Sequence, residues 1–334
     1  MVNSPEFYMQ LALDKAWAFQ GLTYPNPPVG AVVTDNQNSF IAYGVHEKAG
    51  EAHAEVNVIK QAYFNITHDE TILNIKESKK IHEYLYQNHN GIFQDKYIYV
   101  TLEPCNHFGK TPPCSQLLKK LGFEKIFIGT LDPNKTASGG KEFLEKEGLH
   151  VKVLENISCK ELIEPFSIWQ KSPFVFFKLA QSKNGVISGG TITSKESRTH
   201  VHALRDKIDL LVIGGNTVRI DRPTLDARLV DGKAPNILIY SKSQNFDTTI
   251  PLFEVPNRKV FIEESLEKIK DYNFVMIEGG KGMLQACKDF VEYYLIYKSP
   301  HEKKGIPISI EVDLQEHFSS QIGEDRYTWY KKRR

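Results

Sequence analysis

Apolar residues recur at helical spacing at the start of the chain, and short strand-like runs follow. Ser4 before Pro5 is typical of a helix start, and apolar positions between Phe7 and Phe19 continue the helical spacing toward Gly21. In this half the expected strands are 31–33, 40–43, 97–102, 125–131 and 150–154, and the expected helices are 52–63, 113–121 and 141–147. Strands that alternate with helices predict an α/β layer with a largely parallel sheet.

A second alternating series begins near Phe174, so the pattern predicts two domains. Its expected strands are 174–179, 210–213, 237–240, 260–262, 274–277 and 293–297, and its expected helices are 199–207, 265–270 and 283–290. The chain has 334 residues, and single cores stop growing near about 250–300 residues. We therefore expect domains 1–170 and 171–334. Residues 64–95 are polar and carry no strand pattern, which indicates an inserted surface segment outside the core.

Composition and charge narrow the class of protein. The chain is 41% hydrophobic and 25% charged, which excludes a disordered, collagen-like or coiled-coil protein. Its 42 Lys+Arg and 41 Asp+Glu offer no general basic face, so a nucleic-acid partner is not expected. No run approaches the roughly 20 apolar residues of a membrane span, and the first residues show no secretory signal. Four cysteines are too few for a disulfide scaffold, and a cytoplasmic location is expected.

Four residues of the first half have the chemistry of a catalytic zinc site. His53 and Glu55 open an expected helix, Cys105 follows a strand, and Cys114 begins the next helix. One imidazole and two thiolates leave the fourth tetrahedral position of Zn²⁺ open for water, which marks a catalytic site. Glu55 then becomes the proton carrier. Alternatively, each residue is a packing residue, or His107 in the same loop closes a structural zinc site.

A His-x-Glu sequence with a Pro-Cys-x-x-Cys sequence is the signature of zinc nucleobase deaminases. The His-x-Glu part is intact here, but eight residues separate the two cysteines instead of two.

Three segments resemble the deaminase half of the bifunctional riboflavin-biosynthesis deaminase–reductase family, in which the long cysteine spacing is the norm. They are YPNPPVG at 24–30, AGEAHAE at 49–55 and TLEPCNHFGKTPPC at 101–114. The resemblance implies a cytidine-deaminase-like three-layer α/β/α domain with one Zn²⁺ per chain. Its reaction would be hydrolytic removal of ammonia from 2,5-diamino-6-ribosylamino-4(3H)-pyrimidinone 5′-phosphate. The positions implied to contact this substrate are Asn26, His46, His107 and Lys110.

The second half lacks a Gly-x-Gly-x-x-Gly sequence but has a glycine-rich turn, EGGKG at 278–282. This turn lies between a strand ending at Ile277 and a helix expected near Met283. Backbone without side chains at such a place can bind a pyrophosphate, although glycines also serve ordinary tight turns.

Several segments of the second half are similar to the reductase half of the same family. They are FKLAQS at 177–182 with Asn184-Gly185, Leu204-Arg205, GNTVRIDRPTL at 215–225, and Arg228. The resemblance implies a dihydrofolate-reductase-like α/β fold that transfers a hydride from NADPH to the ribose carbon. The implied NADPH positions are Ala180, Thr217, Asp221, Ser241, Gly279, Gly280, Lys281 and Gly282. The implied substrate positions are Lys178, Arg205, Leu225, Arg228 and Glu278. Arg205 and Arg228 suit a fork-shaped clamp on a phosphate, or ordinary surface salt bridges.

One segment of the family is missing. Between Gly185 and Ile192 the family carries a longer stretch with a Ser-x-Trp-Ile run that contacts cofactor and substrate, whereas this chain has only VISGGT. Part of the nicotinamide pocket must therefore be rebuilt or lost. The stretch after Ser299 also matches the family poorly.

The sequence therefore predicts a bifunctional enzyme that uses Zn²⁺ and NADPH on a phosphorylated pyrimidine. We expect a homo-oligomer, dimer or tetramer, with no nucleic-acid or membrane partner. Three alternatives stay open at this point. The deaminase half could be active beside a degenerate reductase half. The chain could be a nucleic-acid base deaminase with a C-terminal RNA-binding module. It could also be a structural zinc fold joined to a nucleotide-sensing regulator.

Overall fold

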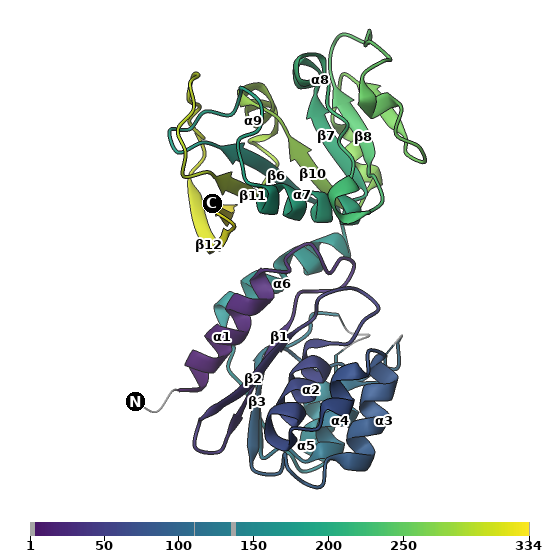
Figure 1. Cartoon of the computed structure of the whole chain (residues 1–334), viewed down its shortest axis with the longest axis vertical. Coiled ribbons are helices and arrows are strands. Elements are labelled where there is room, and N and C mark those ends of the chain that lie inside the picture. The colour runs from purple at the N-terminus through teal and green to yellow at the C-terminus, as the bar shows by residue number, and fades with distance from the viewer. Residues whose placement is uncertain (1–3, 110, 135–137, 334) are drawn as a thin grey trace. The chain divides into compact units, whose positions relative to one another are not determined.

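The chain divides into two compact units, Met1–Ser167 and Ile168–Arg334. The structure, a computed structural model, describes residues 4–109, 111–134 and 138–333. Each unit has its own sheet (Figure 1) and its own buried apolar cluster. Among the helices of the described residues, none combines the length and apolar character that a membrane crossing requires.

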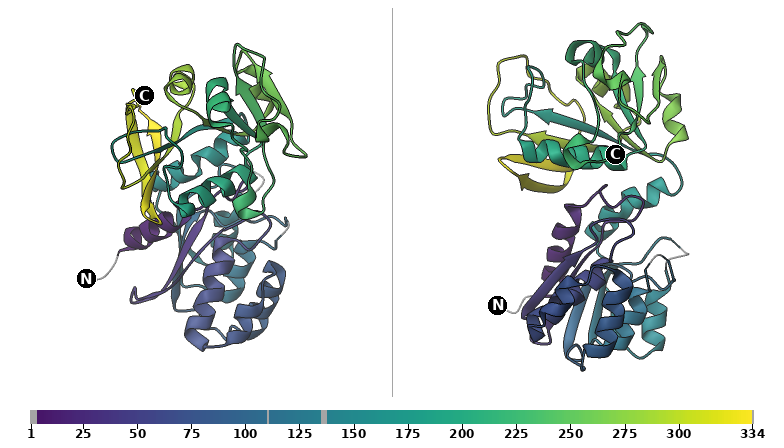
Figure 2. Two further views of the ribbon diagram at one scale, coloured as in Figure 1. Left: turned by 45° about the horizontal axis from the view of Figure 1, so that its top comes forward. Right: turned by 45° about the vertical axis from the view of Figure 1, so that its right-hand side comes forward.

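The first unit is a three-layer α/β/α domain. Its described elements are α1 (Pro5–Trp17), β1 (Gly30–Asp35), β2 (Phe40–Val45), α2 (Ala54–Thr67), η1 (Glu70–Asn74), α3 (Ser78–Asn88), β3 (Lys96–Leu102), α4 (Cys114–Leu121), β4 (Lys125–Thr130), α5 (Gly140–Lys146), β5 (His150–Val153) and α6 (Ile157–Trp169), the last of which runs into the second unit. The sheet lies between α1 and α6 on one face and α2 to α5 on the other (Figures 1 and 2). Ser4 caps α1 as expected, since its hydroxyl accepts a hydrogen bond from the Phe7 amide.

The sheet of the first unit is mixed, so the expectation of a largely parallel sheet is wrong here. The described strands have the order β2-β1-β3-β4-β5. Strand β1 runs antiparallel to β2 and β3, whereas β3, β4 and β5 are parallel. The tight turn after Asp35 joins β1 and β2 as a hairpin, and a hairpin can only be antiparallel, which accounts for the β1–β2 pair.

Residues 64–95 contribute to the core, contrary to the expectation of a surface segment. Helix α3 packs against α2 and α4. Ile72, Ile81, Leu85 and Phe93 are each at most 1% exposed and belong to the apolar cluster of this unit. Four apolar side chains spread over a polar stretch suffice to attach it, because a short amphipathic helix needs only one narrow apolar face.

The second unit is a sheet with helices on both faces. Its remaining described elements are β6 (Phe174–Gln181), α7 (Lys195–Lys207), β7 (Leu210–Gly214), α8 (Gly215–Asp221), η2 (Arg228–Val230), β8 (Asn236–Tyr240), η3 (Pro251–Phe253), β9 (Val260–Glu263), η4 (Glu267–Asp271), β10 (Phe274–Glu278), α9 (Lys281–Cys287), β11 (Tyr293–Lys298), β12 (Leu314–Ile322) and β13 (Asp325–Lys332). The described strands have the order β12-β13-β11-β6-β10-β7-β8-β9. Six neighbouring strands are parallel, as expected: β11, β6, β10, β7, β8 and β9. Strands β12 and β13 add an antiparallel hairpin at one edge.

Several elements of the second unit differ from the expectation. The β12–β13 hairpin and the helix α8 were not expected at all. The helix expected at 265–270 is the 3-10 helix η4, and the helix expected to begin near Met283 begins at Lys281.

The parallel arrangement places the carboxyl ends of β6, β10, β7 and β8 at one edge of the sheet. Because side chains alternate along a strand, Phe177 and Ile277 pack in the apolar cluster with α9. Lys178 and Glu278 therefore lie on the opposite face, toward α7. This edge carries the second candidate site.

Candidate active sites

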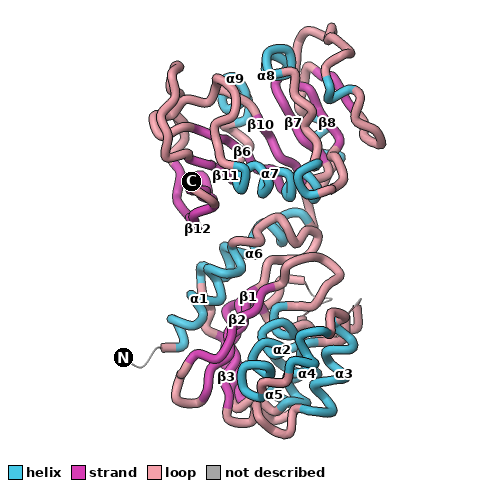
Figure 3. The backbone as a smooth tube through the Cα atoms, in the orientation of Figure 1, coloured by secondary structure: helices cyan, strands magenta, loops and turns pink. Residues whose placement is uncertain are grey.

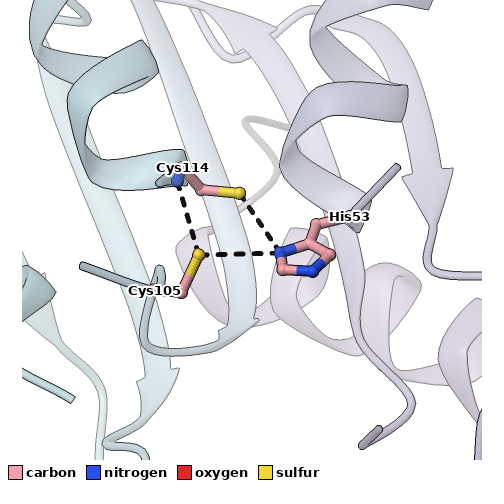
Figure 4. A group of neighbouring side chains, drawn as sticks. All are labelled: His53, Cys105 and Cys114. Carbon is pink, nitrogen blue, oxygen red and sulfur yellow. Dashed lines mark hydrogen bonds between the residues drawn. The ribbon is translucent and has the colours of Figure 1, made fainter. Parts of the chain in front are cut away.

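Three candidate metal ligands come together at the ends of α2, β3 and α4 (Figure 4). His53 is the residue before α2, Cys105 lies in the loop after β3, and Cys114 is the first residue of α4. Their donor atoms all lie within 4.8 Å of one another, and no other His, Cys, Asp or Glu of the described residues belongs to the group. His107, the alternative fourth ligand, is exposed and is not part of it.

The spacing of the donor atoms fits zinc. His53 Nδ1 lies 3.6 Å from Cys105 Sγ and 3.5 Å from Cys114 Sγ. Zn–N and Zn–S bonds of about 2.05 and 2.3 Å at a tetrahedral angle separate nitrogen from sulfur by about 3.6 Å. The other ring nitrogen of His53 lies 3.4 Å from the Thr111 hydroxyl, which can orient the ring.

The two thiols share one proton between them. The hydrogen bond from Cys114 to Cys105, assisted by His53, lowers the pKa of Cys105 to about 4. That same bond, together with burial and the charge on Cys105, raises the pKa of Cys114 well above the ordinary value. The Cys114 amide also donates to Cys105 Sγ over 3.4 Å. Two thiolates at this place therefore need a cation to balance the second negative charge.

Glu55 lies in the first turn of α2 and is 4% exposed. Burial, followed by the negative charge of Cys105, raises the pKa of Glu55 to about 7. The carboxyl group also hydrogen-bonds the Cys114 side chain. A carboxyl group with a pKa near 7 can both accept and return a proton at neutral pH.

Asn26 and His46 form a hydrogen-bonded pair beside the cluster. His46 Nδ1 lies 3.1 Å from the Ala52 carbonyl oxygen, and His46 Nε2 lies 3.0 Å from Asn26 Nδ2. Because a carbonyl oxygen can only accept, Nδ1 carries the proton and Nε2 accepts from the amide. Burial lowers the pKa of His46 to about 4, so the ring is neutral. The rings of His46 and His53 meet edge to face at 5.3 Å.

Of the two other expected substrate positions, His107 lies on an exposed loop, and Lys110 lies outside the described residues. The sequence analysis missed Asp132. Burial raises the pKa of Asp132 to about 6, and the nearby charges of Glu103 and Cys105 act in the same direction, whereas His107 acts in the opposite one. The only sequence signal for Asp132 is its position directly after a strand, which many residues share.

The second candidate site is a charged group on the α7 face of the second sheet. Arg205 Nη2 donates to Glu278 Oε1 over 2.9 Å, and Lys178 Nζ lies 3.7 Å from Glu278 Oε2. All three side chains are at most 13% exposed. Burial alone would raise the pKa of Glu278, but Arg205 and Lys178 hold it below the ordinary value. For Lys178 burial has the opposite effect and lowers the pKa, because it disfavours the charged ammonium group.

Leu225 and Arg228 belong to the loop beside this group. Leu225 is buried and has a φ of +55°, which is rare for a bulky side chain and is found at ligand sites. Arg258, which the sequence analysis missed, holds this loop by donating to the carbonyl oxygens of Thr224 and Leu225 over 2.7 and 2.9 Å. Arg228 is exposed and pairs with Asp226 over 2.6 Å rather than with Glu278. A clamp of Arg205 and Arg228 thus requires Arg205 to share its guanidinium with Glu278.

The expected coenzyme positions follow neighbouring strands at the carboxyl edge. Ala180 lies in β6, Thr217 and Asp221 lie in α8 after β7, Ser241 follows β8, and Gly279, Gly280, Lys281 and Gly282 follow β10. Gly279 has a φ of +157°, and a Cβ there would lie 2.5 Å from Met283 Cγ, so this turn requires glycine. The sequence analysis missed Arg219, whose Nη2 donates to Ser241 Oγ over 3.3 Å. Only the pairing of β7 with β8 brings these two residues together.

Comparison with known proteins identifies the family. Residues 2–130 match the cytidine and deoxycytidylate deaminase zinc-binding region, and residues 173–295 match the RibD C-terminal domain. The riboflavin biosynthesis protein RibD of Aquifex aeolicus is 38% identical over 334 residues, covering 94% of this chain and 84% of that protein. This chain belongs to the RibD family.

Further RibD proteins are similar over part or all of the chain. RibD of Bacillus amyloliquefaciens is 34% identical over 68% of this chain and 56% of its own length. A crystal structure from Thermotoga maritima, a diaminohydroxyphosphoribosylaminopyrimidine deaminase/5-amino-6-(5-phosphoribosylamino)uracil reductase, is 25% identical with a TM-score of 0.63, covering 98% of this chain and 99% of that one.

Membership of the RibD family confirms the resemblance and the expected pair of folds, a deaminase-like domain followed by a reductase domain. The RibD matches indicate Zn²⁺ and NADPH as the cofactors. They favour neither an RNA-binding module nor a nucleotide-sensing regulator in the second half.

Proposed function

We propose that this chain catalyses two consecutive steps of riboflavin biosynthesis. The first removes ammonia hydrolytically from 2,5-diamino-6-ribosylamino-4(3H)-pyrimidinone 5′-phosphate, and the second reduces the ribosyl group of the product to a ribityl chain with NADPH. The observation that carries the proposal is the group of His53, Cys105 and Cys114 with the buried Glu55 beside it.

In the first step, His53, Cys105 and Cys114 would hold zinc, which when bound would supply a hydrolytic nucleophile at neutral pH by lowering the pKa of water. Glu55 accepts the proton of the attacking water and returns it to the leaving amine. Its burial and its raised pKa support this role, because a carboxyl group that titrates near neutral pH can do both within one turnover.

The substrate ring is oriented by Asn26, whose amide His46 holds in place. No described residue donates to the Asn26 Oδ1 atom, so this atom can accept from a donor group of the pyrimidine. His107 and Lys110 follow in the loop between the two cysteines, where a positive charge suits the substrate phosphate.

For the second step, bound NADPH would supply the hydride that reduces the ribose carbon. The residues proposed to hold NADPH are Ala180, Thr217, Asp221, Ser241 and the turn from Gly279 to Gly282. The residues proposed to contact the substrate are Lys178, Arg205, Leu225, Arg228 and Glu278. The cationic side chains of this set suit a phosphorylated intermediate. We propose that Ser241 binds the 2′-phosphate of NADPH, because the guanidinium of Arg219 contacts Ser241 and suits a phosphate.

A coupled assay tests both steps with one substrate. The unchanged protein, incubated with the diaminopyrimidine phosphate and NADPH, should release ammonia and oxidise NADPH. The Glu55→Gln variant should keep its zinc, and its rate of ammonia release should fall by about 10²-fold or more. NADPH oxidation should then return when the deaminated intermediate is supplied. Ammonia release by Glu55→Gln at the rate of the unchanged protein would refute the role of Glu55.

We further propose that the protein acts in the cytoplasm as a homo-oligomer, a dimer or a tetramer. Sedimentation equilibrium of the full chain tests the oligomeric state, and a monomer at every concentration would contradict it.

A further inference from the structure

The proposed NADPH residues lie in one order along the carboxyl edge of the second sheet. Strands β6, β10, β7 and β8 are neighbours in this order. Ser241 follows β8, Thr217 follows β7, Gly279 follows β10, and residues 182–193 follow β6. Neighbouring strands lie about 4.8 Å apart, so β8 and β6 are separated by about 14 Å. If the 2′-phosphate end of NADPH binds at Ser241, the nicotinamide end reaches the loop after β6.

This loop is the one that lacks the Ser-x-Trp-Ile run of the family. Within it, Val186 is buried and Ile187 is half-buried against the apolar cluster of α9. Ile187 Cδ1 lies 3.3 Å from the point where a Cβ of Gly280 would be. An apolar side chain therefore lies directly beside the glycine turn, at the end of the site where the family tryptophan is missing.

A second loop, residues 299–313, holds the loop that carries Ile187 (Figure 2). Neither contains a helix or a named strand (Figure 3). Lys303 Nζ donates to the carbonyl oxygens of Gly189 and Thr191 over 2.7 and 2.6 Å. The main chain of Lys303 pairs with the Asn184 side chain in both directions, over 2.9 and 3.1 Å. Lys303 thus donates three hydrogen bonds and accepts one, and these bonds reach the chain on both sides of Ile187.

The two loops also fit closely along their backbones. Val186 and Pro307 form an isolated antiparallel bridge, and the Ile308 amide donates to the Gly185 carbonyl oxygen over 3.0 Å. Gly305 has a φ of +150°, and a Cβ there would lie 2.7 Å from Val186 Cγ1. Residues 299–313, which match the family poorly, therefore pack closely against residues 182–193, where the Ser-x-Trp-Ile run of the family is missing.

We propose that Ile187 forms the apolar wall beside the nicotinamide ring of NADPH, in place of the missing tryptophan, and that Lys303 is a positioning residue that fixes the Ile187 loop. This inference rests on the proposed reductase function. Ligand pockets are lined mainly by apolar side chains around a few polar groups, and Ile187 lies at this turn beside Gly280. Hydrogen bonds from a charged group are the stronger kind, so the Lys303 ammonium can hold two carbonyl groups of an otherwise irregular loop.

The test compares two variants with two matched controls in the full chain. The variants are Lys303→Met and Ile187→Ala. The controls are Lys304→Met, an exposed neighbour with no such bond in the described part of the chain, and Ile306→Ala, whose side chain is 85% exposed. Calorimetry measures the affinity for NADPH and for 2′,5′-ADP, which lacks the nicotinamide half. Amide hydrogen exchange reports the protection of residues 183–192 without any ligand.

Both variants should bind NADPH about tenfold more weakly, which corresponds to about 1.4 kcal/mol, while binding 2′,5′-ADP and releasing ammonia like the unchanged protein. Lys303→Met alone should raise exchange in residues 183–192, and both controls should match the unchanged protein. Ile187→Ala with normal NADPH affinity, or with an equal loss for both ligands, would overturn the apolar wall. Faster exchange in Lys303→Met with normal NADPH affinity would overturn the positioning role. If the unchanged protein bound neither ligand, the proposed reductase function would fail and this inference with it.

Discussion

Replacing Glu278 with glutamine removes the only carboxylate that the structure places between Arg205 and Lys178 in the described residues. The two cationic groups then stay buried without a counter-charge. Removing one partner of a buried ion pair costs about 3–5 kcal/mol, a large part of the roughly 5–15 kcal/mol by which a domain is stable. We therefore expect the free energy of unfolding of the second unit to fall by about 4 kcal/mol at pH 7.

Urea unfolding followed by tryptophan fluorescence measures this loss. Trp169 and Trp329 are buried in the second unit, whereas Trp17 reports the first. With a denaturant slope of about 2 kcal/mol per M, the second transition should move down by about 2 M while the first stays unchanged. The control is Glu267→Gln, because the pair of Glu267 with Lys270 is more than 70% exposed and such pairs contribute about 0–1 kcal/mol.

The pH dependence adds a second check on the same variant. The pKa of Glu278 lies below its ordinary value in the folded protein, so its stabilisation is present above the ordinary carboxyl pKa and is lost as the pH falls through the folded value. The unchanged protein and Glu278→Gln should thus become alike in strong acid. A loss at pH 7 no larger than that of Glu267→Gln would show that the Arg205 and Lys178 charges are solvated, and the reasoning would be refuted.

Three further outcomes are expected. Cys114→Ser should abolish stoichiometric zinc and lower ammonia release at least about tenfold, as metal analysis and an ammonia assay will show, whereas the buried Cys159→Ser should keep both. Burial lowers the pKa of His200 from 6.5 to about 4, so the unfolded state binds this proton first. The free energy of unfolding of the second unit should therefore fall by about 2 kcal/mol as the pH is lowered from 7 to 5, measured by urea unfolding. A His200→Gln variant with the same pH slope would contradict this. Arg258→Met should release the Leu225 loop and raise the KM for the reductase substrate about tenfold, and an equal rise in the KM for NADPH would argue against a local effect.

The first candidate site could be predicted from the sequence because its chemistry lies in residue types at fixed intervals. His53 and Glu55 are two residues apart at the start of α2, Cys105 lies in the loop after β3 and Cys114 begins α4, so each residue stands at a recognisable end of a helix or strand. Arg219 could not be found in this way. Its contact with Ser241 depends on the pairing of β7 with β8, and strand order is not written in any local pattern.

The C-terminal hairpin and the 64–95 segment show the corresponding limit for the fold. Strand β12 lies at the edge of its sheet and most of its residues are only half-buried, so it lacks the clean alternation that predicts a strand. In residues 64–95 the buried positions Ile72, Ile81 and Leu85 are separated by polar residues, and their burial depends on the neighbouring helices. The positive φ of Leu225 likewise comes from tertiary contacts, among them the bonds from Arg258.

The hydrogen bond from His46 to Ala52 has a consequence for selectivity. The Ala52 carbonyl oxygen can only accept, which fixes the direction of both hydrogen bonds. His46 Nδ1 donates to Ala52, and the Asn26 amide nitrogen donates to His46 Nε2. Asn26 cannot turn its amide over without placing two lone pairs face to face. If Asn26 contacts the substrate as proposed, its Oδ1 atom, which accepts no hydrogen bond from the described residues, would favour a ring that presents a donor over one that presents an acceptor.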